Sequence, residues 1–133
     1  MAKIFFFNVP AYGHVNPSLP VVTELVRQGH HISYYNAKSF EPVIKNTSAE
    51  FRAYPNSAST EADFSGRINN LPSVTVFLLE ESIHLLPFVL SELDREKPDL
   101  VMFDALALWG MQAAHLRKMP SVASIGLLVQ END

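Results

Sequence analysis

Short runs of apolar residues alternate along this chain with longer segments that carry the apolar spacing of helices. A continuous apolar run is typical of a strand buried on both faces, whereas apolar residues three and four positions apart indicate one face of a helix. Repeated alternation of the two predicts an α/β fold, with a parallel sheet and helices on both of its faces. The expected strands are residues 3–8, 31–36, 51–54, 99–104 and 121–129.

Asparagine, proline and glycine mark the ends of the first expected helices. Asn16 is suited to cap a helix whose first residue is Pro17, and Gly29 is suited to end it. A short helix is expected from Ser39, because a proline in its first turn is tolerated. This interpretation places His14 on the loop between the first strand and the first helix.

The middle of the chain is expected to hold a long loop and a long helix. Residues 55–72 are polar and rich in turn residues, and a loop of that length is usually functional or mobile. The apolar period of a helix then runs over residues 73–97, with a kink or restart at Pro87. A last helix is expected over residues 105–119.

The handedness of the connections predicts the order of the strands. Right-handed crossovers that step outwards from the first strand and then return to its other side give a Rossmann-like doubly wound sheet of order 3-2-1-4-5. The first and fourth strands are then neighbours, and the loops after them separate at the topological switch point, where ligands bind. His14 follows the first strand and Asp104 ends the fourth, so both are expected at this point.

His14 and Asp104 are therefore the candidate catalytic pair. A carboxylate that accepts a hydrogen bond from one imidazole nitrogen fixes the tautomer and leaves the other nitrogen free to take a proton from a hydroxyl. Each residue also has a simpler interpretation: His14 as a structural histidine, and Asp104 as the N-cap of the next helix. Their shared place at the switch point favours a general-base dyad.

Composition excludes several other classes. A length of 133 residues predicts one domain over residues 1–133, and a net charge of −4 gives no basic surface for nucleic acid. No apolar run approaches the roughly 20 residues that cross a bilayer, so no membrane is expected and the expected location is cytoplasmic. Without cysteine or a zinc spacing of histidines, no metal is expected. The first turn has one glycine where a dinucleotide fingerprint has three, so no cofactor-binding residues are expected.

Three segments together resemble one enzyme family: GHVNP at 13–17, GHHISYYN at 29–36 and KPDLVMFDALALWG at 97–110. The combination resembles the N-terminal acceptor-binding domain of inverting UDP-glycosyltransferases of the GT-B fold, of the YjiC-type macrolide and flavonoid group. The resemblance covers essentially the whole chain. It implies that His14 is the catalytic base and that Asp104 is its partner.

The resemblance also implies a reaction and its partners. A UDP-sugar would serve as donor co-substrate, without metal or other cofactor, and a hydroxyl of a small apolar acceptor would receive the sugar. A C-terminal domain, whose signature does not occur in this sequence, would hold most of the donor. The chain alone is therefore expected to be inactive, and its exposed domain interface to favour self-association.

Aromatic and apolar residues near the crevice are the candidates for acceptor binding, because they suit flat apolar molecules. They are Tyr12, Phe64, Phe77 and Leu78. Core packing is the alternative interpretation for Phe77 and Leu78, since apolar helix residues usually lie in the core. For the chain as a whole, the alternative is a non-catalytic Rossmann-like interaction module that recruits a partner chain.

Overall fold

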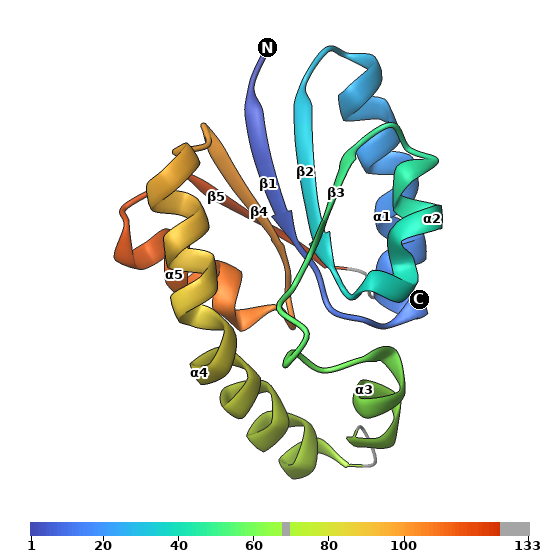
Figure 1. Cartoon of the computed structure of the whole chain (residues 1–133), viewed down its shortest axis with the longest axis vertical. Helices are drawn as coiled ribbons and strands as arrows, with labels where there is room; N and C mark the ends of the chain where they lie inside the picture. The colour runs from blue at the N-terminus through green and yellow to red at the C-terminus, as the bar shows by residue number, and fades with distance from the viewer. Residues whose placement is uncertain (68–69, 126–133) are drawn as a thin grey trace, which may run out of the picture.

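The computed structural model describes residues 1–67 and 70–125. Its centre is a parallel sheet of order β3-β2-β1-β4-β5, which confirms the predicted 3-2-1-4-5 arrangement (Figure 1). The last part of the expected strand 121–129 lies outside the described residues. The strands are β1 (Lys3–Phe7), β2 (His31–Asn36), β3 (Glu50–Ala53), β4 (Leu100–Asp104) and β5 (Ser121–Ser124).

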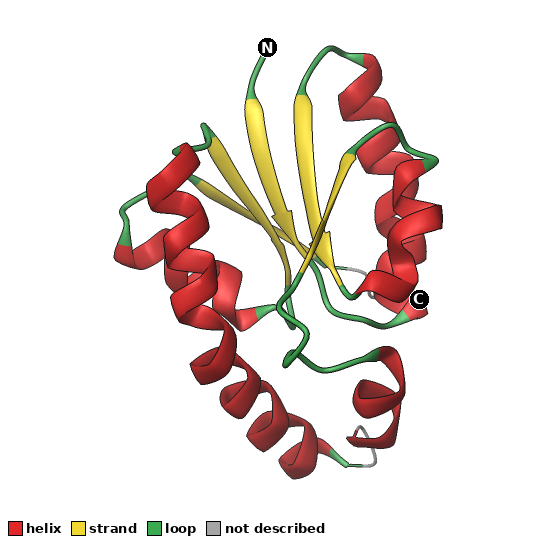
Figure 2. Cartoon of the chain, in the orientation of Figure 1, coloured by secondary structure: helices red, strands yellow, loops and turns green. Residues whose placement is uncertain are grey.

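Helices cover both faces of this sheet (Figure 2). One face packs against α1 and α2, and the other against α4 and α5, while α3 lies beyond the carboxyl ends of the strands. This three-layer arrangement explains why β1 is apolar at successive positions, since each face of the strand has its own core. The helices are α1 (Tyr12–Arg27), η1 (Lys38–Phe40), α2 (Glu41–Lys45), α3 (Glu61–Arg67), α4 (Leu71–Glu96) and α5 (Leu108–Leu116).

Alternate residues of β1 point into the two cores. Phe6 belongs to the core under α1 and α2, whereas Phe7 belongs to the core under α4 and α5. On the second face α5 approaches the sheet closely at Gly110, where an added Cβ would lie 2.9 Å from the Cβ of Phe103 and 3.1 Å from that of Phe7. The missing side chain therefore allows α5 to sit directly on β1 and β4.

The first helix starts earlier than the sequence predicts. It begins at Tyr12 after Ala11, which makes no side-chain capping bond, so Asn16 and Pro17 lie inside the helix and the prediction of a cap at Asn16 is wrong. His14 consequently sits in the first turn of α1 rather than in a loop. The side chain of Asn8, directly after β1, donates to the backbone oxygen of His14 in this turn at 3.2 Å.

Other helix boundaries differ from the prediction in the second half of the chain. The expected polar loop contains α3, and α4 runs as one helix through Pro87. It starts where the Asn70 side chain accepts from the Ser73 N–H at 2.9 Å. The last helix begins at Leu108 with Ala107 as its N-cap, so Asp104 does not cap it. The carboxylate of Asp104 has other partners.

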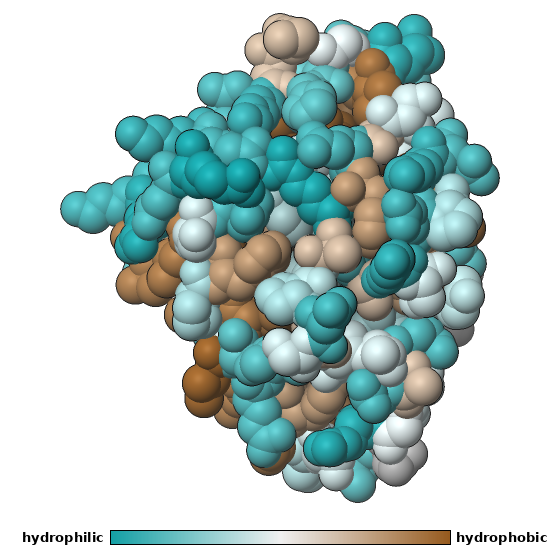
Figure 3. All heavy atoms as spheres, in the orientation of Figure 1, coloured by the Kyte–Doolittle hydropathy of each residue, from teal (hydrophilic) through white to brown (hydrophobic). Residues whose placement is uncertain are grey.

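The helix α4 is long and apolar enough to cross a membrane. Length and composition alone are weak evidence for a membrane-spanning helix, because the core helix of a globular protein has both as well. Leu85 and Val89 bury one side of α4 in the core against the sheet. Its outer side exposes apolar residues, among them Leu79 and Ile83, and Figure 3 shows apolar surface on this side of the molecule. The helix therefore belongs to the domain core and carries an uncovered apolar face.

Candidate active site

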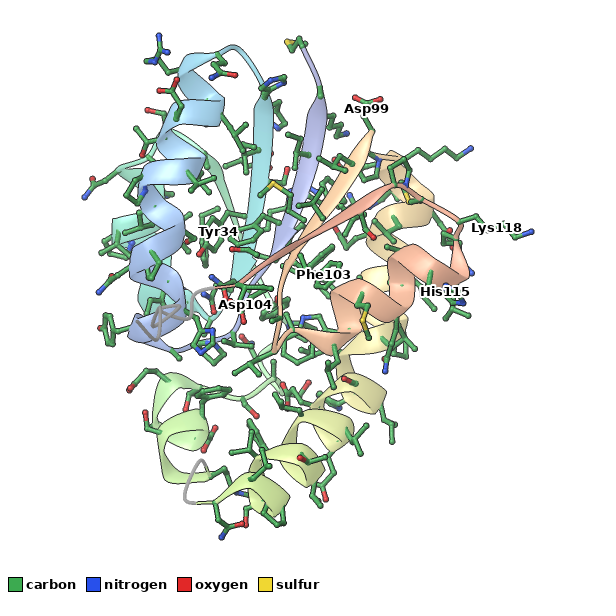
Figure 4. The ribbon with its side chains drawn as sticks, turned by 180° about the vertical axis from the view of Figure 1, so that it is seen from behind. Tyr34, Asp99, Phe103, Asp104, His115 and Lys118 are labelled. Atoms are coloured by element: carbon green, nitrogen blue, oxygen red, sulfur yellow. The ribbon has the colours of Figure 1, made fainter. Side chains whose placement is uncertain are left out.

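The carboxyl ends of β1 and β4 position the candidate pair. These strands are hydrogen-bonded neighbours, with Phe7 opposite Phe103, so the segments that follow them leave the sheet side by side. Asp104 is the last residue of β4, and Figure 4 shows it at the end of the sheet near the start of α1. His14 reaches it from the first turn of α1.

The structure brings His14 and Asp104 into direct contact. His14 Nδ1 lies 3.0 Å from Oδ1 and 2.9 Å from Oδ2 of Asp104. Because an ionised carboxylate only accepts hydrogen bonds, Nδ1 carries the proton in this contact. The N–H of Leu106 also donates to Oδ2 at 3.0 Å. Asp104 is 1% exposed, so these partners replace the water that its carboxylate loses on folding.

The environment favours the protonated imidazole. The pKa of His14 is raised above its ordinary value, chiefly by the hydrogen bond to Asp104 and further by the charge of that carboxylate, while burial opposes both. The His14 side chain keeps 21% of its surface exposed. Within residues 1–67 and 70–125, Nε2 has no hydrogen-bond partner, so in the neutral ring, with the proton on Nδ1, Nε2 is able to accept a proton from a hydroxyl that reaches it.

The residues predicted to bind an acceptor fall into two separate places. Tyr12 is 55% exposed at the start of α1, with its ring 4.8 Å from that of Phe40. Phe64, Phe77 and Leu78 are buried in the core formed with α4 and α5. Phe64 lies on α3 rather than in a loop. The four residues therefore do not form one continuous surface.

A small cavity nevertheless joins two of these residues. The rings of Phe64 and Phe77 are 5.8 Å apart, edge to face, and both line a cavity of about 10 Å³. Pro10, from the segment that leads into α1, and Trp109 of α5 line it too. Its size is that of about one water molecule, so an acceptor ring would enter only if these side chains moved.

A second cavity lies at the carboxyl ends of β2 and β3. It measures about 120 Å³, and Lys38, Tyr54 and Thr60 are among its lining residues. Tyr54 also lines the smaller cavity, so the two adjoin along this edge of the sheet. No group of three or more histidine and acidic side chains in the described part of the chain is arranged to hold a metal ion.

Sequence reasoning missed the polar residues beneath His14. Asn8, Ser18 and Tyr34 are buried and hydrogen-bonded to one another or to the backbone of α1. The sequence contains one feature that indicates this network: Asn8 is a polar residue directly after an otherwise apolar strand. Such a residue needs a buried hydrogen-bond partner, so it points to a network at the edge where ligands bind.

No protein-family model matches the sequence, but curated proteins of similar sequence are known. The chain is 30% identical to NDP-glycosyltransferase YjiC of Bacillus subtilis (strain 168), over 90% of this chain and 30% of that protein. It is also 30% identical to oleandomycin glycosyltransferase of Streptomyces antibioticus, over 86% of this chain and 29% of that protein. The chain thus spans about a third of the length of these curated relatives.

A solved structure of similar fold leads to the same family. The crystal structure of the glycotransferase of kitacinnamycin superposes with a TM-score of 0.80 and 26% identity, over 96% of this chain and 31% of that one. The relatives found by sequence and the protein found by structure are all glycosyltransferases, and the chain covers about a third of each. The chain is a homologue of the YjiC-type NDP-glycosyltransferases and the macrolide glycosyltransferases, and its fold is consistent with the N-terminal domain of the GT-B architecture.

Proposed function

We propose that this chain forms the acceptor-binding, base-carrying domain of a glycosyltransferase that transfers a sugar from a UDP-sugar to a hydroxyl of a small apolar acceptor. The observation that carries the proposal is the contact of His14 Nδ1 with both carboxylate oxygens of Asp104, at 3.0 and 2.9 Å. It leaves Nε2 for an acceptor hydroxyl, and the pair stands at the switch point, where ligands of doubly wound sheets bind. Homology to glycosyltransferases supports the same class of reaction.

In the proposed reaction His14 acts as a general base. Nε2 takes the proton of the acceptor hydroxyl while the hydroxyl oxygen bonds to the anomeric carbon of the sugar. The bond from that carbon to the phosphate oxygen breaks, UDP leaves with the electron pair, and the anomeric centre is inverted. Asp104 stabilises the imidazolium, which then releases its proton to solvent.

The acceptor is proposed to be a flavonoid- or macrolide-like molecule that contacts exposed Tyr12. Phe64, Phe77 and Leu78 would shape its site from within the core, and the cavity lined by Phe64 and Phe77 would have to open to admit a ring. Area burial and stacking on aromatic rings favour such acceptors over polar ones.

The donor is proposed to bind mainly to a further domain outside these 133 residues. The match to about a third of each relative supports this division of labour. Because sugar, acceptor and base must be held together for attack, the chain by itself is proposed to be inactive. Exposed apolar residues such as Ile83, 78% exposed, favour self-association of the isolated chain.

Complementation tests this function. The chain is mixed with or fused to the donor domain of a relative, supplied with UDP-glucose and a flavonoid or macrolide, and assayed for transfer by mass spectrometry. General-base catalysis contributes about 10²–10⁴-fold, so we expect His14→Ala to lower the rate by about that factor. His115→Ala, on the exposed side of α5, is the matched control and should keep parental turnover.

The same assay contains the result that would refute the mechanism. Equal turnover in the parent and His14→Ala would show that another group takes the proton. Transfer in neither protein, despite tight binding of the donor domain, would instead favour the non-catalytic interaction module.

A further inference from the structure

We propose that Asn8 and Tyr34 are positioning residues that hold the first turn of α1 so that His14 stays against Asp104. The inference rests on the proposed role of His14 as base. Neither residue is placed to react with substrate, because both are buried with 0% exposure. They act through the backbone of the helix that carries His14.

Asn8 is the centre of this arrangement. Its Nδ2 donates to the backbone oxygen of His14 at 3.2 Å and to the hydroxyl of Tyr34 at 2.8 Å, while its Oδ1 accepts from the Val9 N–H at 2.7 Å. Every hydrogen-bonding group of the side chain is therefore engaged. One of these bonds holds the residue that carries the candidate base.

Tyr34 extends the network to the next turn of α1. Its hydroxyl lies 2.7 Å from Ser18 Oγ, and Ser18 in turn donates to the backbone oxygen of Val15 at 2.6 Å. Because that donation uses the only hydroxyl hydrogen of Ser18, Tyr34 must donate to Ser18 and accept from Asn8. Each hydroxyl in this series then donates one hydrogen bond and accepts one. The series runs from the amide of Asn8 through Tyr34 and Ser18 to the helix backbone, and all its bonds are donated in that direction.

A second branch connects Asn8 with the element that follows Asp104. The backbone oxygen of Asn8 accepts from the Tyr54 hydroxyl at 2.8 Å, and that hydroxyl accepts from Trp109 Nε1 at 3.0 Å. Trp109 belongs to the first turn of α5, which begins soon after Asp104. Asn8 is thus hydrogen-bonded to the helix that carries His14 and, through Tyr54 and Trp109, to the helix that follows Asp104.

The start of α1 needs such support because its own hydrogen bonding is weak. Ala11 gives no side-chain cap, and Pro17 and Pro20 lie inside the helix. Proline has no N–H, so each removes one backbone bond from the first turns. Gly13, beside His14, adds backbone freedom. The buried network bonds the backbone oxygens of His14 and Val15, which lie next to the two backbone oxygens, of Gly13 and Asn16, that lose their N–H donor to proline.

The titration of His14 in the 133-residue chain tests the proposal without donor or acceptor. Heteronuclear NMR of the imidazole gives its pKa, which contact with Asp104 raises in the parent. We expect Tyr34→Phe to shift the pKa of His14 downwards, towards the ordinary value of about 6.5, because the first turn then holds the ring less closely to the carboxylate. Asn8→Ala should shift it in the same direction.

Tyr35→Phe is the matched control. It removes a hydroxyl from the adjacent residue of the same strand, but that hydroxyl faces Glu92 and Arg52 on the other side of the sheet. We expect the pKa of His14 to stay at the parental value in this variant. Thermal unfolding of all three variants shows how much of any effect follows from lower stability alone.

The outcomes separate positioning from a purely structural role. A folded Tyr34→Phe or Asn8→Ala variant with the parental pKa of His14 would overturn the proposal, as would an equal shift in Tyr35→Phe. If neither variant folds, Ser18→Ala, which removes the last link to Val15, decides by the same criterion. The titration does not depend on turnover, so it stands apart from the complementation assay that tests the base itself.

Discussion

Replacing Asp104 by asparagine probes the candidate pair in this chain alone, because the change keeps the shape of the side chain and removes its charge. The carboxylate accepts from His14 Nδ1 and from the Leu106 N–H. An amide replaces one of the two carboxylate oxygens by an NH2 donor, which faces the Nδ1–H of His14 or the Leu106 N–H, so one buried donor is left without an acceptor while Nδ1 carries its proton. A buried donor without a partner costs about 1–3 kcal/mol. We expect Asp104→Asn to lower the free energy of unfolding by about that amount at alkaline pH.

The loss should grow at acid pH, because the folded-state pKa of His14 is raised by Asp104. A raised pKa gives a stabilising contribution that is fully present below the unfolded value of about 6.5 and disappears as pH rises through the folded-state value. A hydrogen bond to a charged group contributes about 1.5–3 kcal/mol, against about 0.5–1.5 for a neutral one. The difference in the free energy of unfolding between the parent and Asp104→Asn should therefore be about 1–2 kcal/mol larger near pH 5.5 than near pH 9.

Urea unfolding at the two pH values measures this gap, with the single tryptophan, buried Trp109, as the fluorescent reporter. His31→Gln is the control, since it removes the exposed His31 contact with Glu50 at 3.0 Å and should change stability by less than about 1 kcal/mol at either pH. A gap between parent and Asp104→Asn that does not change with pH would refute the reasoning. It would mean that His14 does not gain its proton against this carboxylate in solution.

Two further predictions concern the fold. Gly110→Ala should destabilise the chain by about 1–3 kcal/mol, because the new Cβ would lie 2.9 Å from the Cβ of Phe103; urea unfolding at the parental midpoint would contradict this. Arg52 lowers the pKa of Glu96 to about 2, so the parent should lose stability as pH falls from about 4.5 towards 2. The Arg52→Leu variant should lose less stability than the parent over that range in acid-unfolding curves. A variant curve with the same pH dependence as the parent's would show that Arg52 and Glu96 do not form the ion pair.

The strand order and the meeting of His14 with Asp104 follow from the sequence for a physical reason. Apolar periodicity distinguishes buried strands from helices, and right-handed crossovers leave few ways to order the strands. Once β1 and β4 are neighbours, residues just beyond their carboxyl ends must lie close together. The observed pairing of β1 with β4 bears out this step.

Local signals failed where tertiary contacts decide the outcome. Asn16 and Pro17 have the composition of a helix start, yet the helix begins at Tyr12 without a side-chain cap. Phe64 lies in a polar segment too short to show a helical period, and only its burial against Phe77 reveals that α3 packs there. A sequence pattern does not show which distant residue will satisfy a polar group or cover an apolar one.

The helical position of His14 changes how the proposed base would work. A histidine on a loop would be fixed by the carboxylate alone, whereas this ring stands on a helix turn bonded to Asn8 and also faces a carboxylate at the end of a buried strand. Such a pair is preorganised before any ligand enters, so binding energy from the acceptor is not needed to assemble it. The raised pKa of His14 would then be a property of this chain, and a donor domain would contribute the position of the sugar rather than the state of the base.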